Sequence, residues 1–388
     1  MNTNTSHILV RSIPFLTTFL LLHSFVSAEF TLGDKGAITV GADADLRYDS
    51  NISANSNEDG DTLATALPKI LYRYNQGVVL VDAFVGVEFV EYDEQSQFDS
   101  QNFKSRLELS YPSDAAEHSF SWKLKTGFNE STTADSDLQS IVERERFDFD
   151  LTGRYYVADR YYIRGGFEYR DEEIVTEGFN DVLTLSVPID FYYAYSDNLS
   201  FGLGVEFSDV TVDGPGSPTA DSRDTAYYVA TEGRLLSNLV AEIKLGIESR
   251  DFDSSAFKDA EMLFLGGALR WSPTDRTTFE LDLANGFRNT ARNQSIEESS
   301  VVLTVLHELD EKIVTELSVG YAESDFESLG GVEVRRDETW SLGWGLSYEL
   351  IEDQLSLDFA LSYSDQASDA STADYEDSVV KIGISYTY

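Results

Sequence analysis

Acidic side chains are the most frequent groups in this sequence that could carry chemistry. The 388 residues include 69 Asp and Glu against 28 Lys and Arg, and there is no cysteine. Two histidines lie beyond the N-terminal segment, His118 and His307, and neither stands in a recognisable pattern with a serine or aspartate. Carboxylates are so numerous that some pair will reach the spacing of a glycosidase by chance. We therefore expect no enzyme and no cofactor.

One acidic segment is similar to the start of a calcium-binding loop. In residues 55–61, NSNEDGD, oxygen-bearing side chains stand at the first, third, fifth and seventh positions, and Gly60 stands at the sixth. The bidentate glutamate that such a loop needs at its twelfth position is absent, because Ala66 stands there. We predict a solvated loop rather than a metal site.

The elements that must position the charged side chains are strands. In 199–207, LSFGLGVEF, apolar residues alternate with Ser, Gly and Glu, and this period of two is that of a strand. No helical period is sustained beyond the N-terminal segment. Apolar side chains therefore share one face of each strand, and small or charged ones share the other. The same pattern recurs in 37–48, 118–128, 339–350 and 354–363.

The N-terminal segment differs from the rest of the chain. It holds Arg11, no acidic residue, an apolar run from Ile13 to Val26 and a small-residue end at Ala28. That layout is typical of a cleavable secretory signal, and a retained anchor is the alternative. We predict a signal peptide over 1–28. No later stretch is long and apolar enough for a transmembrane helix.

Short polar turns and longer acidic segments alternate along the chain. Examples of turns are SDN at 196–198 and EDQ at 352–354. This regularity indicates about 18 strands, within a range of about 16–20, over 29–388. The predicted fold is all-β, a transmembrane antiparallel up-and-down β-barrel with short periplasmic turns and longer acidic extracellular loops. A secreted β-sandwich or β-helix with a sugar-binding face is the alternative. The longer segments include 51–61, 129–137, 212–224, 323–338 and 364–377.

The segment DLRYDSNI at 45–52, followed by LPKILYRYN at 67–75 and alternating strands, resembles outer-membrane β-barrel (porin-like) families of Gram-negative bacteria. The resemblance implies a monomeric or trimeric channel in the cell outer membrane. It also leaves open a barrel for exopolysaccharide export or a structural, partner-gated barrel. A sugar conduit should show stacked inward aromatic rings, and we expect no such ladder.

If the apolar face meets lipid, the charged face lines the lumen. The early strands then carry a mixed to basic wall and the later strands an acidic one. Such a field would favour small polar solutes and cations, although the charges could instead pair across neighbouring strands. The predicted function is passive diffusion of small polar solutes with a modest cation preference. The predicted pore-lining residues are Arg47, Arg73, Arg106, Lys123, Lys125, Arg154, Arg164, Glu206, Glu242, Glu248, Glu280, Asp282, Glu316 and Asp358.

The formal charge of −41 argues against nucleic acid as a partner. The expected partners are outer-membrane lipid and lipopolysaccharide, with divalent cations at the acidic loops as a further candidate. The last strand ends at Tyr388, and a terminal aromatic residue is what the barrel-assembly machinery recognises in this class. A homotrimer is one assembly that the sequence allows. The segments 209–224 and 323–338 are the longest loops expected, about 16 residues each. Either these loops partly fold inward to narrow the lumen, long inward side chains narrow it, or a partner fills it.

Overall fold

The computed structural model describes residues 30–32, 36–75, 78–112, 119–215, 218–328 and 332–388. The predicted signal peptide, 1–28, lies outside these residues, as does His118. No helix in the described ranges is long and apolar enough to cross a membrane.

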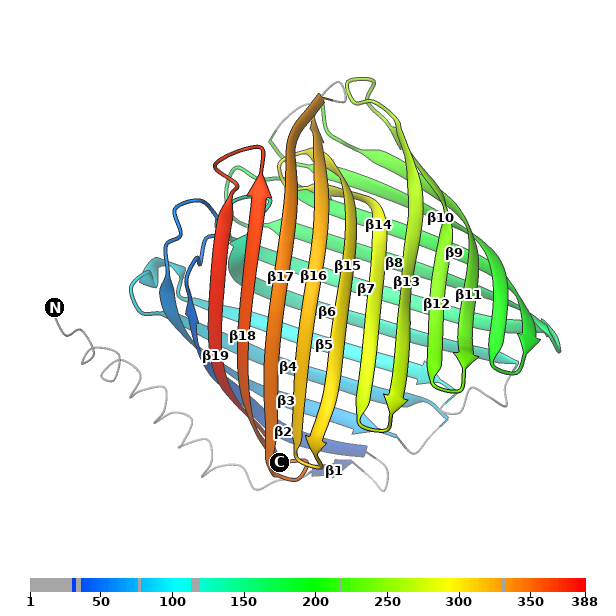
Figure 1. Ribbon diagram of the computed structural model, residues 1–388, viewed down its shortest axis with the longest axis horizontal. Helices are drawn as coiled ribbons and strands as arrows, with labels where there is room; N and C mark the ends of the chain where they lie inside the picture. Colours follow the sequence, from blue (N-terminus) through cyan, green and yellow to red (C-terminus); the bar gives the residue numbers. More distant parts are fainter. Residues whose placement is uncertain (1–29, 33–35, 76–77, 113–118, 216–217, 329–331) are drawn as a thin grey trace.

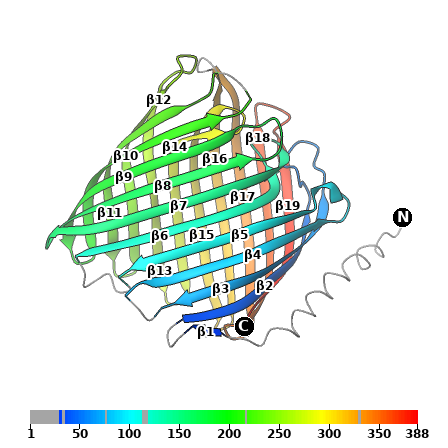
Figure 2. The same ribbon diagram turned by 180° about the vertical axis from the view of Figure 1, so that it is seen from behind.

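In the described part of the chain, eighteen long strands close into one antiparallel ring (Figures 1 and 2). Each strand from β2 to β19 pairs with the next, and β19 pairs back with β2. The short strand β1 pairs with the start of β2, and a short 3-10 helix η1 precedes β5. The bounds are β1 Phe30–Leu32, β2 Gly36–Asp49, β3 Asp61–Tyr74, β4 Leu80–Tyr92, η1 Ser96–Phe98, β5 Ser100–Tyr111, β6 Phe120–Asp135, β7 Ser140–Ala158, β8 Tyr161–Ile174, β9 Asp181–Ser196, β10 Leu199–Asp213, β11 Ser222–Leu236, β12 Leu239–Phe252, β13 Ala260–Thr274, β14 Thr277–Thr290, β15 Gln294–Asp310, β16 Ile313–Ser328, β17 Val332–Ile351, β18 Leu355–Ser368 and β19 Tyr375–Thr387.

The two ends of the barrel differ as predicted. The turns 197–198, 237–238 and 352–354 are short and lie at the end that holds the C-terminus (Figure 1). The expected bounds of the long loops at 209–224 and 323–338 are wrong, because strands occupy half of the first segment and most of the second. Their acidic side chains mark where the wall leaves the lipid, while the backbone goes on pairing beyond that level.

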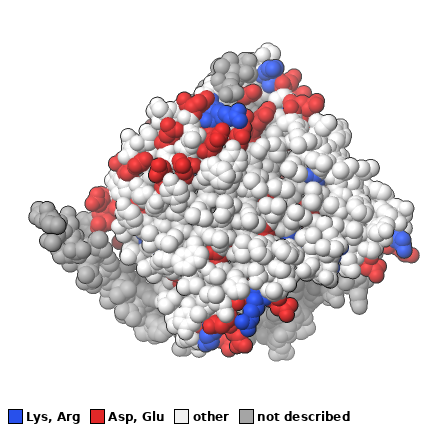
Figure 3. Space-filling model, in the orientation of Figure 1, with Lys and Arg blue, Asp and Glu red and all other residues white. Residues whose placement is uncertain are grey.

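The apolar face of the strands points outward. Leu203 is 66% exposed and Ile247 is 54% exposed, whereas Tyr162 and Tyr192 on the other face are fully buried. Figure 3 shows a largely uncharged band across the middle of the face in view, with acidic residues gathered above it and a smaller charged group below it. In a membrane this band meets lipid, because the closed sheet satisfies its backbone groups internally.

Glycine on the inner face of β10 is required by its neighbours. In register, Gly204 stands between Tyr228 of β11 and Asp190 of β9. A Cβ atom on Gly204 would collide with the Tyr228 ring and the Asp190 carboxylate. By contrast, a Cβ atom on Gly266 of β13 would meet no atom within 4 Å. The wall therefore has no room for a side chain at position 204, whereas it has room for one at position 266.

We predict that Gly204→Ala lowers the free energy of unfolding by about 1–3 kcal/mol, since it overpacks a closely packed wall. Gly266→Ala serves as the control and should change it by less than ~0.5 kcal/mol, since its Cβ enters open space. Urea unfolding of both variants in lipid vesicles measures the difference. Equal changes in the free energy of unfolding for the two variants would show that Tyr228 is not closely packed against position 204.

Candidate functional site

Three predicted bases on the early strands are paired with acids of neighbouring strands. Arg73 and Arg106 lie 3.2 Å and 3.1 Å from the two carboxylate oxygens of Asp82. Lys123 lies 3.3 Å from Glu108, and Arg106 lies 3.7 Å from it. These ions form one ladder across β3, β4, β5 and β6, so their charges largely cancel within the wall.

Two further predicted bases lie on the same strands. Arg47 lies 3.8 Å from Asp49, its neighbour on the inner face of β2. Lys125 stands opposite Glu108 and Asp150 in register, and no ion pair within 4 Å joins it to any described residue.

Arg154, Arg164 and Glu242 come together in a dense cluster between β7 and β12. Arg164 donates to Asp190 at 2.9 Å, to Glu232 at 2.7 Å and to Glu242 at 3.0 Å. Arg154 donates to the other oxygen of Glu232 at 2.7 Å. Because the side chain of Asp190 is almost fully buried, these charge-assisted bonds compensate its loss of hydration. The cluster joins strands that are not neighbours in the sheet.

An aromatic row lies beneath this cluster, contrary to the expectation of no ladder. The rings of Tyr162 and Tyr192 stack with centroids 4.9 Å apart and planes 11° apart, and Tyr156 lies 5.1 Å from Tyr162. Tyr228 and Phe264 stack at 5.3 Å. The period of two places these aromatic residues on the inner faces of their strands, but only the register of the strands brings the rings together.

Cations cover this aromatic row. Arg154 lies 4.8 Å from the centre of the Tyr162 ring, Arg164 lies 5.1 Å from Tyr192, and Lys244 lies 4.6 Å from Tyr228. These are cation–π distances. The three tyrosines are buried beneath these cations. Their ring faces are therefore not available for stacking against a sugar.

The predicted acids Glu206 and Glu280 each have one basic partner. Glu206 lies 3.6 Å from Lys244, and Glu280 lies 3.2 Å from Arg270. One carboxylate oxygen of Glu248 is buried and has no hydrogen-bond partner in the described part of the chain.

The remaining predicted acids lie on β14, β16 and β18. Asp282 and Glu316 are exposed and have no ion pair or hydrogen bond to a described residue. Asp358 accepts one hydrogen bond from Ser356 at 3.3 Å. The structure therefore gives the bases partners more often than it does the acids of these strands.

The turn between β6 and β7, residues 136–139, crosses the mouth of the barrel. From β14, Arg288 donates to both carboxylate oxygens of Asp137. Arg292, in the following turn, donates to the carbonyl oxygen of Leu138 at 2.6 Å. Since β14 lies across the ring from β6 and β7, these contacts join opposite sides of the barrel.

A third arginine holds the same turn from β17. Arg335 donates to the carbonyl oxygens of Ser136 and Asp137 at 3.1 Å and 3.2 Å. Its guanidinium is buried and is also paired with Asp337. None of these arginines was among the predicted site residues. The signal was present, because basic residues in RNTARN at 288–293 and VRR at 334–336 interrupt acidic surroundings.

Other loops converge on the same place. Asn55 donates to the carbonyl oxygen of Gln139 at 3.2 Å, and Asn180 donates from its backbone to Ala291 at 2.8 Å. Asn293 donates to the carbonyl oxygen of residue 218, in the loop between β10 and β11, at 2.9 Å. The mouth is therefore narrowed by several short inward contacts rather than by one long loop.

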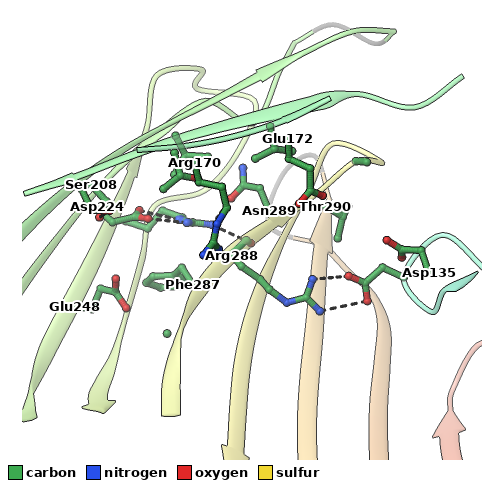
Figure 4. Close-up of a pocket in the computed structure, with 18 of the residues that line it drawn as sticks. Asp135, Arg170, Glu172, Ser208, Asp224, Glu248, Phe287, Arg288, Asn289 and Thr290 are labelled. Carbon is green, nitrogen blue, oxygen red and sulfur yellow. Dashed lines mark hydrogen bonds and ion pairs between the residues drawn. The ribbon is translucent and has the colours of Figure 1, made fainter. Parts of the chain in front are cut away.

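A polar cavity of about 630 Å³ lies at the β6–β7 turn (Figure 4). Arg170 and Glu172 line it from β8, and Glu248 and Arg288 line it from β12 and β14. Beside it Arg250 is fully buried, and its guanidinium is held by Asp224, Asn289 and Ser295. These hydrogen bonds hold together the part of the wall that faces the β6–β7 turn.

The loop at 55–61 uses its oxygen atoms within the protein. Asp61 accepts hydrogen bonds from the backbone of Glu94 and Gln95, and Asn55 accepts one from the backbone of Asn57. No group of three or more potential metal-ligating side chains occurs in the ranges that the structure describes.

We compared the sequence and the fold with those of known proteins. Residues 37–388 match the family described as Putative beta-barrel porin 2. The outer membrane protein OpdK of Pseudomonas aeruginosa is similar in structure, with a TM-score of 0.50 and 10% identity, covering 90% of this chain and 99% of that one. OccK2 (OpdF) of the same organism gives 0.51 and 10%, covering 93% and 99%. At such low identity these likenesses show the fold alone. No curated protein matches the chain.

The closed ring of strands, the outward apolar face and the inward charged face all agree with this match. The family match extends over nearly the whole chain beyond the predicted signal peptide. The chain belongs to the Putative beta-barrel porin 2 family and is a porin-like β-barrel of the outer membrane.

Proposed function

We propose that this barrel is a channel for passive diffusion of small polar solutes, with a modest preference for cations. The observation that carries the proposal is the uneven pairing of charge around the lumen. Arg73 and Arg106 are paired with a carboxylate, whereas Asp282 and Glu316 have no ion pair with any described residue. Unpaired carboxylates in a confined channel raise the local concentration of cations.

The contacts across the mouth support a second candidate, a structural barrel or one that opens only with a partner. Three arginines hold the β6–β7 turn from the opposite side of the ring, at residues 136–139. A planar-bilayer recording of the refolded mature chain separates the two. Stable conductance steps support the diffusion channel, and silence from a folded barrel supports the second candidate.

We predict that the wild-type channel is cation-selective in a KCl gradient. Glu316→Gln combined with Asp358→Asn should lower the ratio of K⁺ to Cl⁻ permeability, since both charges lie on the inner face. The reversal potential measures this ratio.

The matched control changes two outward acids, Glu338→Gln combined with Glu376→Gln. These residues share the face of Trp340 and Ile382, which are exposed on the outer surface. The control should leave the reversal potential unchanged. An anion-selective wild-type channel would contradict the lumen assignment while leaving a pore.

We also predict that the β6–β7 turn limits conductance. Arg288→Ala combined with Arg292→Ala removes two of its anchors and should raise single-channel conductance severalfold, since the narrowest part of a channel dominates its resistance. The control pair is Arg223→Ala with Arg276→Ala, two exposed arginines away from the turn. If both pairs conduct like the wild type, the turn does not restrict the path.

A further inference from the structure

A recess in the inner wall lies away from the mouth, where β12, β13, β14 and β15 pair. It has a volume of about 500 Å³. Its floor consists of the small residues Gly266, Ala268 and Ala284, with Gly266 and Ala284 directly opposite each other. The space above Gly266 is open, since an added Cβ atom would meet nothing within 4 Å. This glycine is not covered by a neighbouring ring, so it leaves room for a solute.

Two of the three charged residues that line the recess are already engaged. Glu242 accepts a hydrogen bond from Arg164 at 3.0 Å. The ammonium group of Lys244 lies 3.6 Å from Glu206 and 4.6 Å from the centre of the Tyr228 ring, both on strands beyond the recess. Lys244 is therefore held by two partners, whereas Glu242 keeps one oxygen that has no hydrogen bond to a described residue and faces the lumen.

The third charged residue is Asp282. Its carboxylate is exposed to the lumen and has no ion pair or hydrogen bond to any residue that the structure describes. Phe264 also lines the recess, with the Tyr228 ring stacked 5.3 Å away, and Ser300 adds a hydroxyl group from β15. The recess therefore combines one unpaired carboxylate, one aromatic ring, one hydroxyl group and a small-residue floor.

We propose that this recess binds the protonated amino group of a small organic amine, with its carbon chain over the small-residue floor. This proposal rests on the proposed channel function and names a solute class for it. An unpaired carboxylate forms a charge-assisted hydrogen bond with an ammonium group, and an aromatic ring attracts the same charge. An anion would find no unengaged cation here. A bare divalent ion needs about six oxygen ligands, more than the carboxylates of Asp282 and Glu242 and the Ser300 hydroxyl group supply.

The test is binding of n-propylammonium chloride to the full mature barrel folded in detergent, measured by calorimetry at constant ionic strength against KCl. We expect saturable binding to the wild type. Asp282→Asn should weaken it about tenfold or more, the loss expected for one charge-assisted hydrogen bond. Gly266→Leu fills the recess and should abolish binding while the barrel stays folded.

Matched changes on β18 serve as controls. Asp358→Asn and Ala360→Leu make the same chemical changes on another part of the inner wall, and both should bind like the wild type. Absence of saturable binding to the folded wild type, or equal weakening in the controls, overturns the proposal. Binding is measured independently of conduction. A barrel that conducts ions but does not bind propylammonium would therefore refute only the proposal for the recess. A barrel that binds but does not conduct refutes only the channel.

Discussion

The whole structure depends on the closure of one sheet, through the pairing of β19 with β2. In lipid every backbone N–H and C=O group needs a partner within the protein, and an open sheet edge leaves a row of them without one. Register from Val379 opposite Asp49 to Thr387 opposite Gly41 removes that edge. The backbone of Tyr388 adds a last bond to Val40. Once the ring is closed, the period of two along each strand decides which side chains meet lipid and which meet the lumen.

Closure also limits the volume available to inward side chains. Two large rings fit because a neighbouring strand carries glycine: Tyr192 lies over Gly202, and Tyr228 lies over Gly204. Where no neighbouring side chain lies over a glycine the wall is hollow, as at Gly266, because the opposite Lys244 points to Glu206 and Tyr228 instead. The same residue type therefore has opposite consequences on β10 and β13. The lumen is shaped by this alternation of filled and hollow wall as much as by its charges.

The local sequence pattern predicts much of the fold, but it does not predict the contacts that narrow the mouth of the barrel. Alternation predicted the strands, the outward face and the short turns, because each depends on residues close in sequence. The loop bounds at 209–224 and 323–338 were wrong, because acidic composition reports exposure to water rather than the end of pairing. The bonds from Arg288 and Arg335 to the turn at 136–139 join residues far apart in the chain. They depend on the curvature and register of the whole ring, which no short segment encodes.

In the proposed channel, the mouth and the inner wall would select solutes by different properties. At the mouth Arg335 and Arg292 donate to backbone carbonyl oxygens, and Arg288 is paired with Asp137, so these cations are engaged in holding the turn. Charge that a solute can meet without displacing an ionic partner lies on the inner wall, at the base Lys125 and at the acids Asp282 and Glu316. Size would then be selected where the loops converge and charge along the wall. Because different residues would carry these two functions, the proposal implies that the geometry of the opening can change without changing the sign of the ion preference.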